Sequence, residues 1–310
     1  GQGPMEYRQP DSVWPFVGDR SLLVDLGNAR VTELDADGTF GDTHRIIIGE
    51  MRPGSSMLML IPQGVDDQGR VYVTQRAGYR PGQPFPDSST IVRATLATSA
   101  FDTVTQVQTQ KMDVQSSGGN VQVRPIPLSP QDVWGVAPDG RVVVARAGDY
   151  HVEWHHPDGT VVSGDPVPFR PIRIGRDEKL EYLQQGAGSG IRMEMMRDGG
   201  GQARMSMSRG SDPTDPEPDL DAYDWPETLA PVVVGARVNE DGLGRAWVQK
   251  SRPGGEARSY DLFGGDGNIV GTVTLPEGRR VITFGEGAVY VTYQDEFDLV
   301  YLEKYALPSP

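Results

Sequence analysis

The stretch VEWHHPDG, residues 152–159, recurs in outline twice more in this chain of 310 residues. The related stretches are VTELDADG at residues 31–38 and YDLFGGDG at residues 260–267. Each begins with alternating residues and ends in Asp-Gly, where glycine adopts the positive φ of a tight hairpin turn without steric penalty. One hairpin frame used three times predicts a repeated antiparallel β architecture.

Another hairpin precedes each copy, as an apolar strand, a polar turn and a second strand rich in β-branched residues. This pattern appears five times, at residues 12–24, 59–73, 132–144, 232–248 and 280–291, with looser second hairpins at residues 90–104 and 299–307. Two hairpins make a four-stranded sheet, and units spaced by about 50 residues are typical of β-propeller blades. A β-sandwich would not repeat paired hairpins in one order. We therefore expect an all-β fold, a single propeller domain over residues 1–310.

Three stretches resemble a known family. LLVDLGNARVTELDADG, residues 22–38, resembles an NHL-type repeat, and GQGPMEYRQP, residues 1–10, resembles the Gly-x-Gly-Pro linker that precedes such a blade. The ending GEGAVYVTYQDEFDLVYLEKYAL, residues 285–307, is similar to the last blade of bacterial NHL-like six-bladed propellers. The resemblance implies a propeller from a mostly uncharacterised, exported family, in which a further blade usually precedes the linker.

The number of blades stays open between six and five. The fifth unit stops at YALPSP without an outer strand, and the first ten residues do not have a strand pattern. Either upstream residues are missing, or residues 190–208 substitute for a blade. We expect a six-bladed ring with an incomplete or irregular first blade, and a five-bladed ring is the alternative.

Residues 175–229 do not fit the blade pattern and are expected to form an insert. DEKLEYLQQ, residues 177–185, predicts a short helix, which GAGSG at residues 186–190 ends. SDPTDPEPDLDAYDWPE, residues 211–227, is rich in proline and acids and contains no Lys or Arg, which predicts an extended surface loop. Its acids, with Asp215, Glu217 and Asp219 at the centre, are candidate contacts for a basic partner; loose calcium binding is the other functional reading.

Between the helix and this loop lies GIRMEMMRDGGGQARMSMSRG, residues 190–210, with five of the ten methionines. Alternation predicts a hairpin with one apolar face, which carries Met193, Met195, Met205 and Met207. An isolated two-stranded ribbon is marginally stable in water, so this face must cover something. Packing on the propeller, docking on a partner protein and binding of Cu(I) are the three alternatives.

Composition excludes several classes of function. The formal net charge of −14 opposes binding to nucleic acid and to anionic lipid. No apolar run approaches the length of a membrane-spanning helix. The lack of cysteine excludes disulfides, thiolate nucleophiles and Cys-ligated metals. The absence of an initiator Met and of a signal peptide suggests a processed or trimmed N-terminus.

His151, Glu153 and His155 are the weak metal candidates of the sequence. Alternation places them on one face of a strand, and two imidazoles with a carboxylate have the chemistry of a metal site. The same frame positions elsewhere carry Arg30 and Ser259, so these are ordinary blade positions that accept varied residues. A structural role is therefore the competing interpretation.

Some six-bladed propellers are calcium-dependent lactonases or lyases, with acidic, amide or His ligands that face the central channel. Acidic or amide residues near expected strand ends are Asp25, Asn28, Asp66, Asp67, Asp149 and Asp295. Aspartate at the start of a turn is expected from turn chemistry alone, and no set of four stands apart from the repeat. The sequence also lacks a nucleophile elbow and a dinucleotide fingerprint.

We therefore expect a non-catalytic scaffold or protein-binding module in the periplasm or outside the cell, with no cofactor. It would be an extrinsic subunit of an envelope or membrane-associated complex, held by protein contacts. A metal-dependent hydrolase or lyase, with calcium on the propeller axis, is the alternative. A small-ligand sensor is the second, because a propeller mouth is concave.

Overall fold

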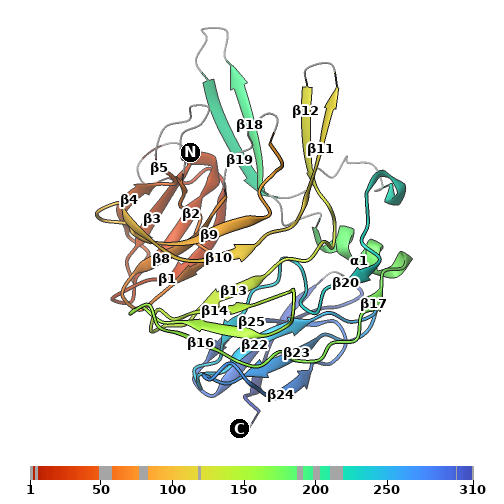
Figure 1. The fold of residues 1–310 in the computed structure, drawn as a ribbon. Helices are drawn as coiled ribbons and strands as arrows, with labels where there is room; N and C mark the ends of the chain where they lie inside the picture. The colour runs from red at the N-terminus through yellow and green to blue at the C-terminus, as the bar shows by residue number, and fades with distance from the viewer. Residues whose placement is uncertain are drawn as a thin grey trace. The chain divides into compact units, whose positions relative to one another are not determined.

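The computed structural model describes residues 3, 6–48, 58–76, 83–117, 120–186, 191–197, 203–209, 219–297 and 299–308. Within these residues the chain is an all-β propeller with five blades, mostly four-stranded antiparallel sheets, and one short α-helix (Figure 1). It divides into two compact units. Unit 1 comprises Gly1–Pro84, Thr90–Thr103 and Tyr182–Asp219, and unit 2 comprises Phe85–Ser89, Val104–Glu181 and Leu220–Pro310.

Unit 1 contains most of blades 1 and 2. Blade 1 consists of β1 (Pro10–Pro15), β2 (Ser21–Asp25), β3 (Arg30–Leu34) and β4 (Phe40–Arg45). Blade 2 consists of β7 (Gly64–Val65), β8 (Arg70–Arg76), β9 (Ser88–Thr95) and β10 (Ala100–Gln108), whose last two strands run across the boundary of the units. In both blades the strands pair in chain order, as two successive hairpins require.

Unit 2 contains the other three blades. Blade 3 consists of β13 (Val133–Val136), β14 (Val142–Ala145), β15 (Val152–His155) and β16 (Val161–Ser163). Blade 4 consists of β21 (Asn239–Glu240), β22 (Ala246–Lys250), β23 (Ser259–Phe263) and β24 (Ile269–Thr274). Blade 5 has three strands among the described residues, β25 (Arg279–Gly285), β26 (Ala288–Gln294) and β27 (Val300–Ala306).

The Asp-Gly turns form where the sequence predicts them, and Gly267 shows why glycine is needed. It has a φ of 78°, the left-handed region that side chains disfavour. A Cβ on this residue would lie 2.4 Å from the backbone nitrogen of Gly164. The turn of blade 4 thus approaches the backbone of blade 3 too closely for any side chain.

The core lies between successive blades, because both faces of a blade are covered. In β22, Ala246 and Val248 pack in one buried cluster with Trp154 of blade 3. Trp247, which points to the other face, packs in a second cluster with Val291 of blade 5. A third cluster joins blades 1 and 2 within unit 1. The apolar runs in these strands follow from burial on both faces.

The third strand of blade 5 departs from this rule. The third strands of the four complete blades, β3, β9, β15 and β23, are mostly buried. By contrast, every residue of β27 is exposed except Glu303, which is half-buried. Because no fourth strand pairs with it in the described residues, β27 is the open edge of its sheet.

Elements outside the blades are short. The described ones are η1 (Leu26–Asn28), η2 (Leu220–Ala222), α1 (Arg176–Gly186), and four strand pairs: β5 (Ile47–Ile48) with β6 (Leu58–Met59), β11 (Met112–Ser117) with β12 (Asn120–Pro125), β17 (Ile172–Arg173) with β20 (Thr228–Leu229), and β18 (Ile191–Arg197) with β19 (Ala203–Arg209). The helix confirms the prediction for residues 177–185, and β18 with β19 confirms the methionine hairpin. The β11–β12 pair was not predicted.

The structure has five blades within the described residues, the smaller of the two numbers that the sequence allowed. The expectation of six is not met there. The β18–β19 hairpin does not substitute for a blade, because among the described residues its two strands pair only with each other. In its register Met193 lies opposite Met207 and Met195 lies opposite Met205, but the side chains of both strands lie outside the described residues.

Candidate functional site

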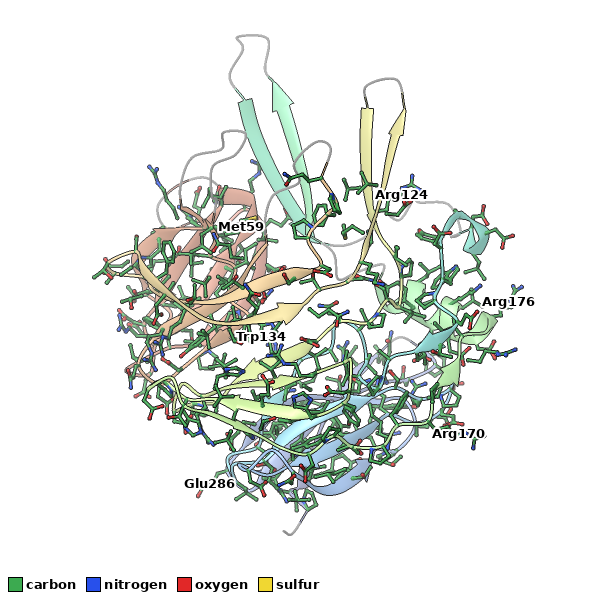
Figure 2. The ribbon with its side chains drawn as sticks, viewed as in Figure 1. Met59, Arg124, Trp134, Arg170, Arg176 and Glu286 are labelled. Carbon is green, nitrogen blue, oxygen red and sulfur yellow. The ribbon has the colours of Figure 1, made fainter. Side chains whose placement is uncertain are left out.

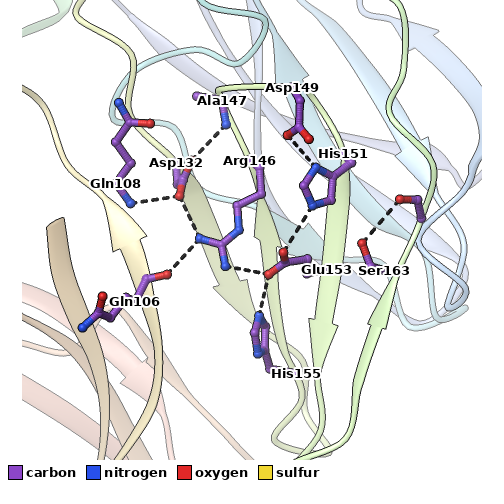
Figure 3. Close-up of polar contacts among 11 residues, drawn as sticks. Gln106, Gln108, Asp132, Arg146, Ala147, Asp149, His151, Glu153, His155 and Ser163 are labelled. Atoms are coloured by element: carbon purple, nitrogen blue, oxygen red, sulfur yellow. Dashed lines mark hydrogen bonds and ion pairs between the residues drawn. The ribbon is translucent and has the colours of Figure 1, made fainter. Parts of the chain in front are cut away.

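The three predicted metal candidates meet on one face of blade 3 (Figure 3). Nε2 of His155 lies 2.9 Å from Oε2 of Glu153, and Nε2 of His151 lies 3.2 Å from Oε1 of the same carboxylate. Nδ1 of His151 is 2.7 Å from Oδ1 of Asp149. The alternation that placed these residues together is therefore confirmed.

Arg146 fixes the chemistry of this cluster. Its Nη2 donates to Oε2 of Glu153 at 2.6 Å, and its Nη1 donates to Oδ2 of Asp132 and to the carbonyl of Gln106, at 2.9 and 2.8 Å (Figure 3). The guanidinium thus occupies the position beside Glu153 that a metal ion would need. Across the described part of the chain, no group of three or more His, Asp or Glu side chains is arranged to hold a metal.

The pKa values in the cluster follow from burial and this guanidinium. Burial opposes ionisation of Glu153, but hydrogen bonds from Arg146, His151 and His155 outweigh it and lower the pKa of Glu153 to about 2. Burial also lowers the pKa of His155, and the neighbouring carboxylate offsets this only in part. Glu153 is therefore a permanent anion at neutral pH, which makes it a poor general base.

Asp132 gives the cluster its structural role. Its carboxylate accepts hydrogen bonds from the backbone amides of Gln108 and Ala147, each at 2.9 Å, as well as from Arg146. These contacts tie the end of β10 to blade 3 within unit 2. Removing a buried acid of this kind would leave amide donors and a guanidinium unpaired, which is costly. The cluster is thus a clamp of charges rather than a reactive centre.

Turn aspartates form a second recurring arrangement. Asp66 and Asp241 are buried, and each accepts from the amides two and four residues later with Oδ1. Oδ2 accepts from an arginine four residues later, at 2.6 and 2.7 Å, and from an aromatic side chain six residues later, at 2.9 Å in both cases. Asp295 makes the same amide and tyrosine bonds at the surface. The prediction that turn chemistry explains such aspartates is confirmed.

The other calcium candidates are also engaged locally. Asn28 donates to Oδ2 of Asp25 at 2.6 Å, and Asp25 accepts from the amide of Gln9 at 2.9 Å. Asp67 is an exposed turn residue. Asp25 and Asn28 share one turn, Asp66 and Asp67 share another, and Asp149 and Asp295 each lie in a turn of their own in unit 2.

The side chains of most partner-binding candidates in the insert lie outside the described residues. Met193, Met195, Met205 and Met207 belong to β18 and β19, whose side chains lie outside the described residues, as do Asp215 and Glu217 altogether. Asp219 is exposed. No helix within the described residues is long and apolar enough to cross a membrane.

Two features of unit 2 have the properties of binding surfaces. One is the open edge strand β27, whose Val300 and Leu302 are each 67% exposed. The other is a pocket of about 700 Å³, lined by Pro168, Phe169, Arg170, Pro171, Ile172, Lys250, Ser251, Arg252, Pro253, Glu256, Ala257, Ser259 and Thr274. Figure 2 labels Arg170 at the surface of unit 2.

Comparison with known proteins yields similar folds only. No family model and no curated protein matches the chain. Among solved structures, a member of the DUF4221 family from Bacteroides vulgatus is 9% identical to this chain and has a TM-score of 0.47. The match covers 98% of this chain and 81% of that protein. Virginiamycin B lyase from Staphylococcus aureus is 13% identical over 97% of this chain and 85% of the lyase, with a TM-score of 0.33. A gluconolactonase from Xanthomonas campestris is 14% identical over 92% of this chain and 84% of the lactonase, with a TM-score of 0.30. These proteins assign the chain to no specific family.

Proposed function

We propose that this chain is a non-catalytic protein-recognition module that binds an extended segment of a partner along β27. The observation that carries the proposal is a contrast among the described residues: four blades have a fourth strand, and blade 5 ends in an exposed third strand. An exposed apolar edge is a template for strand addition and a hazard for aggregation. A partner strand would complete the sheet and remove both problems.

The hydrogen bonds of β27 define which backbone groups are available. The ladder between β26 and β27 is flanked by bonds from the amide of Asp295 to the carbonyl of Leu299 and from the amide of Leu307 to the carbonyl of Gly287. Antiparallel ladders alternate, so the odd-numbered residues of β27 bond to β26. The N–H and C=O groups of Val300, Leu302 and Lys304 therefore point to the open edge.

The side chains of these same three residues indicate what the partner presents. Val300 and Leu302 offer an apolar strip on one face of β27, and Lys304 adds a cation on that face. A partner strand with β-branched or aromatic residues opposite the strip and an acid opposite Lys304 would match it. Backbone bonds would supply affinity, and these side chains would supply specificity.

The hydrogen bonds and ion pairs of the buried and half-buried acidic groups support a non-catalytic role. Glu153 is held as an anion by Arg146, and Asp66 and Asp241 are saturated by turn amides, arginine and aromatic donors. A general base or nucleophile requires a group that is free to exchange a proton or attack. Clamped groups of this kind stabilise blades instead.

We further propose that the chain belongs with the NHL-like bacterial propellers that residues 22–38 resemble, and that it works in the periplasm or outside the cell. There it would be an extrinsic subunit of an envelope complex, attached through protein contacts. The methionine hairpin is a candidate for a second contact.

The test compares Leu302→Pro with Leu302→Ala as tagged baits in extracts of the native source. Proline removes an N–H that points to the open edge, whereas alanine removes only the side chain. We expect wild type to retain a partner that Leu302→Ala holds more weakly, because the side chain of Leu302 is lost, and that Leu302→Pro loses. In the purified complex, hydrogen exchange should slow at Val300, Leu302 and Lys304.

The proposal fails if Leu302→Pro, with an unchanged melting temperature, retains the same partners as wild type. It also fails if the chain stays partnerless after gentle extraction from its source. Turnover of lactone or ester substrates with stoichiometric bound calcium would establish the hydrolase alternative instead.

A further inference from the structure

The pocket of unit 2 lies between an extended segment, residues 168–172, and the strand ends of blade 4. Its walls are largely apolar, with three prolines, Phe169 and Ile172. A volume of about 700 Å³ is within the usual range for small-molecule sites. The polar groups in it are mainly donors, and their bonding determines what the pocket accepts.

Arg170 is the first unused donor. It is exposed, and within the described residues no hydrogen bond, ion pair or ring contact engages its guanidinium. A guanidinium carries five N–H donors in a planar fork that matches a carboxylate.

Lys250 is the second donor with unused capacity. Its nearest acid is Asp261, with Nζ 3.4 Å from Oδ1. Asp261 is already satisfied by two hydroxyl groups, because Thr272 donates to Oδ1 at 2.7 Å and Tyr150 donates to Oδ2 at 2.6 Å. The ammonium group has three donors and uses at most one of them weakly, so it retains capacity for an anion.

A hydroxyl pair adds a neutral donor. The side-chain oxygens of Ser259 and Thr274 are 3.0 Å apart, so one hydroxyl donates to the other. The hydrogen of the accepting hydroxyl remains available. Glu256 is the one acidic residue of the lining, and it is exposed. The pocket thus presents more donors than acceptors.

The part of the wall around Arg252 is held in place by α1. Glu181 accepts from both Nη atoms of Arg252, at 2.6 and 3.0 Å, and Glu178 accepts from the amide of Gly254 at 2.8 Å. Arg252 is therefore neutralised and serves as part of the wall. A wall fixed in this way reduces the ordering cost of binding.

From these contacts we propose that the pocket binds a small organic carboxylate with an apolar body. Arg170 and Lys250 hold the carboxylate, the free hydroxyl of the Ser259–Thr274 pair donates to it, and Phe169 with the prolines covers the apolar part. The proposal is independent of strand addition at β27, which lies on different residues.

The experiment titrates the whole chain with benzoate and hexanoate, and with benzamide and hexanamide as neutral counterparts of the same shape, by calorimetry and ligand-observed NMR. We expect the carboxylates to bind at least about tenfold more tightly than the amides, since charge-assisted bonds exceed neutral ones. Arg170→Gln and Lys250→Gln should each weaken carboxylate binding about tenfold and leave the amides unaffected.

Arg173→Gln is the matched control, because Arg173 is also exposed and unengaged among the described residues but does not line the pocket. It should leave the affinity unchanged. Equal binding of amides and carboxylates, no binding of either, or equal losses in the Arg170 and Arg173 variants would each overturn the proposal. Melting temperatures of all variants within a degree or so of wild type would show that the fold is intact.

Discussion

β23 of blade 4 and β27 of blade 5 are both the third strand of their sheet, and both are rich in apolar and aromatic residues. Leu262 of β23 is 3% exposed, whereas Leu302 of β27 is 67% exposed. β23 lies between β22 and β24, and its blade is packed on both sides. The difference shows that the position of a strand in its sheet and between neighbouring blades, rather than its composition, decides how far it is buried.

The turn aspartates extend the comparison to polar groups. Asp241 and Asp295 accept from the same backbone positions and from an aromatic donor six residues later. Asp241 is buried and paired with Arg245, whereas Asp295 is only half-buried, with Leu299 where the arginine would be. One motif is thus used in two environments, which makes matched substitutions informative.

The largest effect is expected for Asp241→Ala. The variant leaves the guanidinium of Arg245 and the indole N–H of Trp247 without their acceptor in a buried site, which costs about 3–5 kcal/mol of unfolding free energy. Asp295→Ala should cost much less, because water replaces the lost bonds. Denaturant unfolding of both variants measures the contrast. Similar losses would show that burial does not set the strength of the motif.

Leu262→Ala against Leu302→Ala makes the same comparison with apolar groups. Truncation of Leu262 leaves a cavity in the cluster with Trp247 and should cost about 2–5 kcal/mol. Truncation of Leu302 removes a solvated side chain and should stay within about 0.5 kcal/mol. A loss above 1 kcal/mol at Leu302, measured by chemical denaturation, would mean that β27 is covered in solution by another part of the protein.

The third contrast is in pH dependence. The pKa of Glu153 is lowered from its usual 4.5 to about 2, so its contribution to stability is complete above about pH 4.5 and is lost as pH falls towards 2. Glu153→Gln should therefore flatten the decline of unfolding free energy in this range. Glu303 of blade 5 also has a lowered pKa, caused by Arg279 and Tyr305, but it is solvent-screened.

Glu303→Gln should consequently change the same curve less, and the change should shrink at high salt. Unfolding curves at several pH values, at low and high salt, check both variants. Equal flattening by the two substitutions would contradict the view that the Arg146 clamp is worth more than a surface pair.

The hairpins of the blades could be predicted from local sequence patterns. The full set of residues around Glu153 could not, because it depends on which strands pair in the fold. Asp-Gly turns and alternation are encoded within about ten residues, so the hairpins of blades 1, 3 and 4 followed from sequence, as did a blade 5 with three strands among the described residues. Alternation also brought His151, Glu153 and His155 together. It did not reveal Arg146, which comes from the neighbouring strand end, because pairing between strands has no local signal.

The surfaces proposed for binding show the same limit. Arg170 and Lys250 are 80 positions apart in the numbering and line one pocket only because an extended segment lies beside the strand ends of blade 4. The turn aspartates did have a signal, since Asp66, Arg70 and Tyr72 repeat as Asp241, Arg245 and Trp247 at equal spacing. The β11–β12 pair has Gly118-Gly119 in place of Asp-Gly, with alternating apolar residues on both sides, so it carries a hairpin signal that lies outside the repeated frame.

The smallest expected effect tests the direction of the backbone groups in β27. Leu302→Pro removes an N–H at the open edge and should change the unfolding free energy by less than about 1 kcal/mol, because proline is tolerated where its nitrogen faces solvent. Glu303→Pro removes an N–H that bonds to β26 and should destabilise the blade measurably more. Comparable losses in thermal and denaturant unfolding would mean that the even-numbered groups are already bonded, and β27 would then not be an open edge. A small loss at residue 302 alone would establish that β27 differs from β23 in its missing neighbour and not in its own stability as a strand.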